Sequence, residues 1–199
     1  MENERDDIWK EVVLADERAR QGRVDRLNVL NIGISTDPIP IPALAAEYFE
    51  EARLCWYTGA YIAAILMAQL SFEEFFRSHY RAVFGVGGKL KSGSTIDRAQ
   101  FFDLLNEANQ DGTITQEEFC RLDGIRKARN AYVHTKDSVP SDVAKPNFFD
   151  QMLKVSAPHL VGISAENEAR TSIQTLVELF APICARSFGL THTSASTEA

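Results

Sequence analysis

Hydrophobic residues recur with helical spacing over much of this chain. The segment from Glu4 to Gln21 places Ile8, Val12 and Ala15 on one face, as in an amphipathic helix. Gly22 follows directly, and glycine is a poor helix residue that often marks an end. The pattern therefore predicts a first helix that ends at Gly22.

The pattern changes between Arg23 and Pro42. Pro38, Pro40 and Pro42 alternate with isoleucine, and this alternation favours an extended arm because proline lacks the N–H group that a helix uses. Leu27 to Ile34 is the one stretch in which we consider a strand. We expect this arm to lie across the core or to bind a neighbouring chain.

The rest of the chain predicts a bundle of helices. The segment from Gly59 to Phe84 begins apolar on every side, which is typical of the most buried helix of a bundle. Its neighbours show one apolar face each. The predicted helices after the arm span about 42–58, 59–84, 98–108, 115–134, 148–155 and 165–188, with Asp97 as a cap of the third and a bend near Pro182 in the last.

These elements define the expected fold class and domain organisation. We predict an all-α protein: a helical bundle of four to five core helices with an N-terminal helix and an extended arm. Residues 1–42 form the helix and the proline-rich arm, residues 43–188 the bundle, and residues 189–199 a small polar tail that we expect to be disordered.

Composition limits the classes of function. The chain has 199 residues, a net charge of −7 and 45% hydrophobic residues, as an ordinary globular protein has. The negative charge argues against a protein that coats nucleic acid, since that requires a broad positive surface. Met1 to Arg20 lacks the apolar core of a secretory signal, and Ala60 to Leu70 is too short to span a membrane. We therefore expect a cytoplasmic protein that does not bind membranes.

The cysteines provide no metal or redox motif. Cys55, Cys120 and Cys184 are widely spaced, and no C-x-x-C pair occurs. We expect three reduced thiols, no metal site and no cofactor.

Two segments resemble binding loops. Residues 85–94 (GVGGKLKSGS) resemble a phosphate-binding loop but lack its register and a preceding strand, so a mobile connector is the better interpretation. In residues 107–118, Glu107, Asn109, Asp111 and Glu118 fall on ligand positions of a calcium loop. The alternative there is a simple turn, with Thr115 and Glu118 as the capping box of the next helix.

That next helix carries most of the candidate chemistry. Between positions 121 and 136 five basic residues stand against one acid, a local net charge of +4 in a protein of −7. A basic segment of this kind indicates anion binding or a solvated face. The basic residues are Arg121, Arg126, Lys127, Arg129 and Lys136.

The spacing within this helix limits how a site can form. Asn130 and His134 are four residues apart and share a face, whereas Arg129 and His134 lie about 140° apart at 100° per residue. One helix therefore does not bring Arg129 and His134 together. Two copies related by a two-fold axis would do so.

The segment Arg129-Asn130-Ala131-Tyr132-Val133-His134 resembles the R-x4-6-H motif of HEPN domains. The helix AYIAAILMAQLSFEEFFR, which follows Gly59, is similar to the long N-terminal helix of that family. The turn DGTITQEEF and the segment LDGIRKARNAYVH resemble its approach to the motif helix. The likeness covers roughly residues 43–134.

The resemblance implies a homodimer whose motif helices face each other, and many HEPN domains are metal-independent ribonucleases, some of them toxins or defence effectors. It implies His134 as general acid and base, Arg129 as the group that stabilises phosphoryl charge, and Asn130 as an orienting residue. Flanking RNA would contact Arg126, Lys127 and Tyr132.

Other members of the family are not enzymes, so two alternatives stand beside an endoribonuclease. The first is a non-catalytic helical module that binds a nucleotide or a protein partner such as an antitoxin. The second, weaker alternative is a calcium sensor built on Glu107–Glu118.

Overall fold

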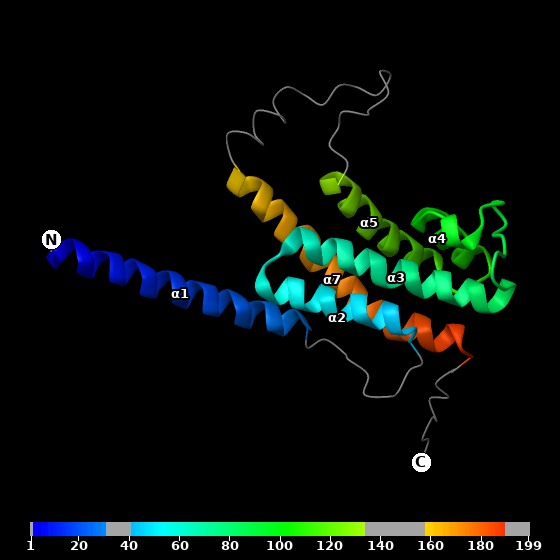
Figure 1. Ribbon diagram of the computed structural model, residues 1–199, viewed down its shortest axis with the longest axis horizontal. Helices are drawn as coiled ribbons and strands as arrows, with labels where there is room; N and C mark the ends of the chain where they lie inside the picture. Colours follow the sequence, from blue (N-terminus) through cyan, green and yellow to red (C-terminus); the bar gives the residue numbers. More distant parts are fainter. Residues whose placement is uncertain (1, 31–40, 134–157, 190–199) are drawn as a thin grey trace, which may run out of the picture.

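The computed structural model describes residues 2–30, 41–133 and 158–189, and it confirms an all-α protein (Figure 1). These residues contain no strand, only an isolated bridge between Lys89 and Thr95. The helices are α1 (Glu2–Leu30), α2 (Ala43–Thr58), α3 (Tyr61–Phe84), η1 (Ile96–Arg98, a 3₁₀ turn), α4 (Phe101–Gln110), α5 (Gln116–Val133) and α7 (Pro158–Ser187).

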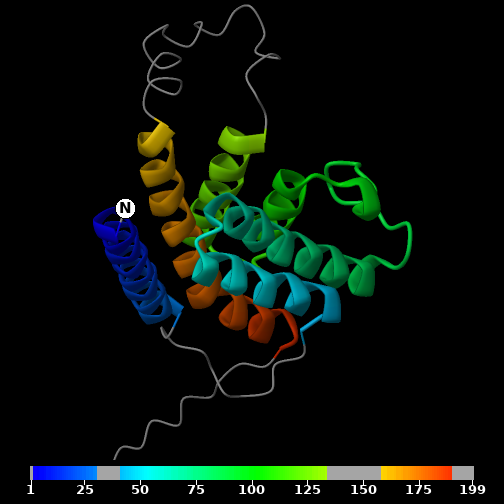
Figure 2. The same cartoon turned by 60° about the vertical axis from the view of Figure 1, so that its left-hand side comes forward.

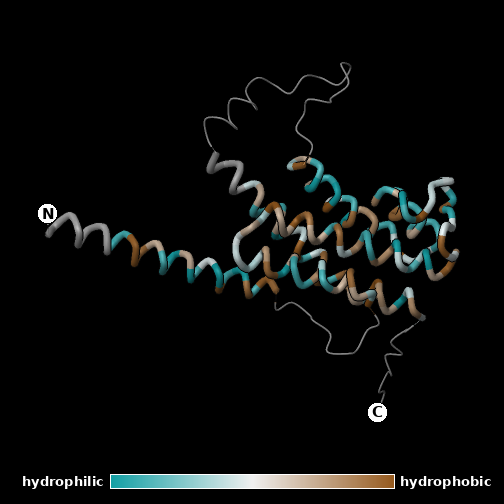
Figure 3. Tube along the Cα trace, in the orientation of Figure 1, coloured by the Kyte–Doolittle hydropathy of each residue, from teal (hydrophilic) through white to brown (hydrophobic). Residues whose placement is uncertain are grey.

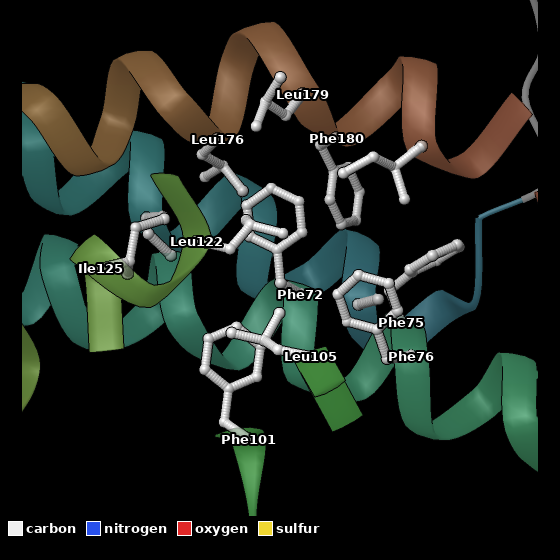
Figure 4. Packing of buried hydrophobic residues seen from close by; sticks show 14 of the residues in the cluster. Phe72, Phe75, Phe76, Phe101, Leu105, Leu122, Ile125, Leu176, Leu179 and Phe180 are labelled. Atoms are coloured by element: carbon white, nitrogen blue, oxygen red, sulfur yellow. The ribbon is translucent and has the colours of Figure 1, made fainter. Parts of the chain in front are cut away.

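Helix α3 is the centre of the bundle, as its apolar sequence predicts. It packs against α2, α4, α5 and α7, and nine of its residues are buried. The rings of Phe72 and Phe75 meet Phe180 of α7 edge to face, with centroids 5.3 and 5.9 Å apart (Figure 4). Such contacts add to the hydrophobic stabilisation of burial. The aromatic core therefore joins α3 to α7.

Helix α1 differs from its prediction. Gly22 does not end it, and residues 23–30, expected in the arm, complete the helix, so no strand forms at 27–30. The cost of a helical glycine is only about 1 kcal/mol. It is offset where the end of α1 docks: Val29 and Leu30 are buried, and the Trp56 indole N–H donates to the Arg26 carbonyl over 2.9 Å.

The N-terminal part of α1 extends beyond the bundle, whereas its C-terminal end lies against α2 and α7 (Figures 1 and 2). Arg26 fixes this end. Its Nε donates to the Tyr57 carbonyl at 2.9 Å, and its Nη1 donates to the Tyr61 hydroxyl at 3.2 Å. Among the described residues, contacts thus anchor α1 at its carboxyl end only.

Helix α2 ends as predicted. Gly59 adopts a left-handed conformation with φ of +83°, and its N–H bonds to the Trp56 carbonyl at 3.1 Å. Glycine has no Cβ to oppose this conformation, so the chain reverses here and α3 packs back along α2.

Helix α4 begins later than predicted. Asp97 does not cap it. This residue lies in the 3₁₀ turn η1, and its Oδ1 pairs with Arg81 Nε of α3 at 2.8 Å. The cap is a reciprocal arrangement of Gln100 and Asp103, one turn further on. Buried Ile96 explains the shift, because the turn holds this side chain in the core.

Residues 85–94 are tied to the bundle. Leu90 is buried, the Leu90 N–H bonds to the Ser94 carbonyl at 3.0 Å, and the Lys91 N–H donates to Glu107 Oε2 at 2.8 Å. This connector therefore packs on the bundle through Leu90 and Lys91, and its mobility stays a prediction.

Helix α7 begins at Pro158, seven residues before the predicted start, and contains Pro182. Several predictions lie outside the described residues: the arm at 31–40, His134, a helix at 148–155 and the tail from 190. None of the described helices has an apolar stretch long enough to cross a membrane.

Candidate functional site

The amino end of α5 is fixed by the predicted capping box. The Glu118 N–H donates to Thr115 Oγ1 at 3.2 Å, and the Thr115 N–H donates to Glu118 Oε2 at 2.8 Å. Leu122 and Ile125 then point into the core. These contacts set the direction in which α5 carries its basic residues.

The calcium interpretation is wrong for the described residues, because three of its acidic ligands each bond to a different part of the protein. Glu118 accepts a bond from Arg186 at 2.6 Å as well as capping α5. Asp111 accepts the Tyr80 hydroxyl at 2.8 Å, and Glu107 accepts a backbone N–H from the 85–94 loop. No three acidic, cysteine or histidine side chains converge as a metal site within the described ranges.

The basic charge of α5 is largely paired. Asp123 is 7% exposed and accepts Arg126 at 2.6 Å and Lys127 at 2.8 Å, while Arg121 bonds to Glu178 of α7. Burial raises the pKa of the Asp123 carboxyl, but its bonds to Lys127 and Arg126 outweigh burial and leave the pKa below its ordinary value. Asp123 is already subtracted in the local excess of +4, so only the pair of Arg121 with Glu178 of α7 lowers that excess further.

The side chains of the two predicted RNA-contacting cations, Lys127 and Arg126, differ in their exposure to solvent. The Lys127 side chain is 71% exposed, so its ion pair with Asp123 lies at the surface. The Arg126 side chain is 26% exposed and lies over the Phe102 ring, 5.0 Å from its centroid. Sequence reasoning missed Phe102 because it lies on α4, and only tertiary packing brings it to α5. Lys127 is the better placed of the two for an incoming phosphate.

Arg129 and Asn130 lie at the carboxyl end of α5 and are half-buried. Arg129 Nη1 donates to Asn130 Oδ1 at 3.0 Å. The structure thus brings two of the three predicted catalytic residues together. His134, the third, follows the end of α5 by one residue and lies outside the described residues.

Tyr132 packs toward α7 and the core. Burial raises the pKa of its hydroxyl, a hydrogen bond with Ser164 opposes the rise, and the charge of Glu168 adds to it. This ring is therefore part of the contact between α5 and α7, and the structure does not place it beside Lys127 as a second surface group.

A groove of about 240 Å³ runs between α5 and α7. None of the predicted site residues within the described ranges lines it. Gly124 and Ala128, four residues apart, leave the space on α5, and Thr171 and Ser172 face them from α7. The full lining is Arg121, Gly124, Ile125, Ala128, Asn167, Glu168, Thr171 and Ser172. The small residues of α5 were the available sequence signal.

All three cysteines are free thiols. Burial raises the pKa of the Cys184 thiol to about 12, so this group stays protonated and unreactive at neutral pH.

No protein-family model, no curated protein and no solved structure gives a match to this chain.

Proposed function

We propose that this chain is a HEPN-like, metal-independent endoribonuclease that acts as a homodimer, with Arg129 and His134 as its catalytic residues. One observation carries the proposal: the bond of 3.0 Å from Arg129 Nη1 to Asn130 Oδ1 at the end of α5. This bond orients the guanidinium plane. An oriented guanidinium suits the two oxygens of a phosphodiester.

The chemistry follows from these side chains. The 2′-hydroxyl of RNA attacks the adjacent phosphorus, a histidine takes its proton, and the 5′-oxygen leaves with a proton from a second donor. The products are a 2′,3′-cyclic phosphate and a 5′-hydroxyl. His134 has the residue type whose ordinary pKa, about 6.5, suits both proton transfers near neutrality. Arg129 stabilises the charge that develops on the phosphoryl oxygens.

Two copies are required for this mechanism. Arg129 and His134 lie about 140° apart around α5 if the helix continues to His134. A second copy whose α5 helix faces the first α5 would supply the missing half of each site. It would also provide a second histidine as proton donor. The HEPN-like arrangement of facing α5 helices is therefore part of the proposal.

The surroundings allow a narrow RNA site. The protein is acidic overall, so substrate must be held where positive charge gathers. Lys127 is exposed but lies about 160° from Arg129 around α5, so it would contact a different part of the RNA strand. A toxin or defence effector controlled by a protein partner such as an antitoxin is a cellular role that fits this activity.

The test is RNA cleavage by the purified full chain in EDTA. We expect fragments with cyclic-phosphate ends, and Arg129→Ala or His134→Ala should slow cleavage by about 10² to 10⁴-fold. Arg121→Ala is the matched control, because it removes an arginine of α5 that is bonded to Glu178. If the Arg129 and His134 variants cleave RNA as fast as the wild type does, or if cleavage requires a metal, the proposal is contradicted.

The groove between α5 and α7 supports a second candidate function, a non-catalytic module that binds a nucleotide or a protein. Its volume of about 240 Å³ is at the small end for a ligand site, and it does not use Arg129. Ala128→Trp would fill it. This function predicts no RNA cleavage and ligand binding that Ala128→Trp removes but His134→Ala leaves intact.

A further inference from the structure

The N-terminal half of α1 has an apolar surface that nothing covers within the described chain. This half of α1 extends beyond the bundle (Figures 1 and 3). Every residue from Lys10 to Gln21 is exposed, including Val12 at 48%; Val13 and Leu14, exposed by 55 and 50%, lie on other sides of the helix. An isolated helix of this length is marginal in water, because helix formation depends on packing of an apolar face. This segment therefore lacks the packing that stabilises the docked end of α1.

A charge-free strip runs along this half of α1. Val12, Ala15, Ala19 and Gly22 follow each other at intervals of three or four residues, so they lie within about 40° of one line on the helix. Ile8 falls on the same line by its register. No charged residue lies on this strip between positions 8 and 22.

The strip continues the face by which α1 docks on its own bundle. Arg26 and Val29 fall on the same side of the helix, where Arg26 bonds to Tyr57 and Val29 is buried. The docked turns show that this side of α1 is a packing face. Toward the N-terminus the face continues past the bundle, with no neighbour from the part of its chain that the structure describes.

Charge indicates which partner fits. Residues 2–17 hold seven acidic and two basic side chains, whereas residues 18–30 hold four basic and one acidic. A second α1 that runs antiparallel places each acidic half beside a basic half, while a parallel one places like charges together. The helix is thus electrostatically complementary to a reversed copy of itself.

Side-chain size indicates the same register. With a two-fold axis near Ala15, Val12 lies opposite Ala19 of the second copy, so a larger residue meets a smaller one. Glu11 and Arg18 share one flank of the strip. In this register each Glu11 faces Arg18 of the second copy, and the pair occurs twice.

We propose that the N-terminal half of α1 pairs antiparallel with α1 of a second copy of this chain, across the Val12–Ala15–Ala19 strip. The pairing is self-complementary and closed, as in two-fold dimers generally. It stands apart from the ribonuclease proposal, because it uses α1 and leaves the end of α5 uncovered by α1. Either proposal can fail without the other.

The first test measures the mass of the full chain by sedimentation equilibrium at micromolar concentrations. Ala15→Glu puts a charge in the middle of the strip and should weaken the dimer about 100-fold or more, since a buried unpaired charge is costly. Leu14→Glu is the matched control, because it adds the same charge one residue away on another side of α1. Circular dichroism of both variants checks that the bundle stays folded.

The second test separates antiparallel from parallel pairing by charge exchange. Glu11→Arg should weaken the dimer about 10-fold through repulsion from Arg18, and adding Arg18→Glu should restore it. If the wild type and Ala15→Glu have the same association state, whether monomer or a dimer formed through α5, the proposal is overturned. An Ala15-dependent dimer in which the double variant is not restored would overturn its antiparallel register.

Discussion

The two ends of α5 are built differently. At the amino end Glu118 bonds both to the Thr115 N–H and to Arg186, and Leu122 is fully buried. At the carboxyl end no residue from Arg126 to Val133 is fully buried. One end of the helix therefore holds the fold together, while the other presents polar groups whose removal should cost little stability.

This difference has a physical reason. A charged group that is locked between fixed partners stabilises a fold but has little freedom to exchange those partners for a substrate. A group near the surface keeps a low cost of rearrangement, and a bond to a neighbouring amide gives it a defined direction. Substitutions along α5 test this contrast, because their expected effects on the free energy of unfolding decrease from the amino end to the carboxyl end.

Leu122→Ala should have the largest effect. The side chain is 0% exposed, so its truncation should lower the free energy of unfolding by about 3 kcal/mol through lost burial and a cavity. Urea unfolding followed by circular dichroism measures the change. Val133→Ala at the other end, where the side chain is 40% exposed, should cost less than about 1 kcal/mol. Equal costs would remove the contrast between the ends.

Glu118→Ala should come next, because it removes both the capping bond and the partner of Arg186. We expect a loss of about 1–3 kcal/mol in the free energy of unfolding. Glu117→Ala is the control, since Glu117 is exposed on the adjacent position of the same turn. If both variants unfold at the same urea concentration, Glu118 does not anchor α5.

Acid should weaken the amino end through the same carboxylate. Burial raises the pKa of Glu118, but the Thr115 N–H and Arg186 outweigh burial, so the pKa in the folded protein is below its ordinary value. The folded state then binds this proton less readily than the unfolded chain does, and the stability is present above about pH 4 and lost as the pH falls below that. Urea midpoints between about pH 6 and pH 3 measure the loss.

Glu118→Gln provides the control for this pH dependence, since glutamine does not titrate. Its curve of stability against pH should be flatter than that of the wild type, with Asp123 providing part of the remaining slope because its pKa is lowered as well. Identical curves for the two proteins would show that other carboxylates dominate acid unfolding.

Arg129→Ala should have the smallest effect on stability, within about 0.5 kcal/mol, as for a substitution outside the core. Arg126→Ala should cost more, about 1 kcal/mol, because it removes an ion pair to buried Asp123 and the contact with Phe102. A large loss with Arg129→Ala would make Arg129 a structural residue and weaken the ribonuclease proposal.

Much of the secondary structure is readable from local signals. The left-handed Gly59 and the Thr115–Glu118 box act within a single turn, so their residue types alone identify the boundaries. The continuation of α1 past Gly22 was not readable in this way. It depends on Arg26 and Val29 docking on a bundle that lies far along the chain.

The candidate site shows the same division. The pairing of Asp123 with Lys127 follows the four-residue spacing of a helix and was within reach of the sequence, but a count of charges did not reveal it. The pairing of Arg121 with Glu178 and the position of Phe102 beside Arg126 join residues from different helices, so no spacing rule predicts them. HEPN membership and RNA cleavage stay predictions of the sequence that await experiment.

The sequence by itself determined that this protein is helical, that α3 is its core and that the RNAYVH segment follows a basic helix, because periodicity, caps and charge are local properties. Only the tertiary structure decided which of those charges are neutralised, where a groove opens between α5 and α7, and which half of α1 stays uncovered. These features depend on contacts between distant residues, and such contacts arise only when the helices pack.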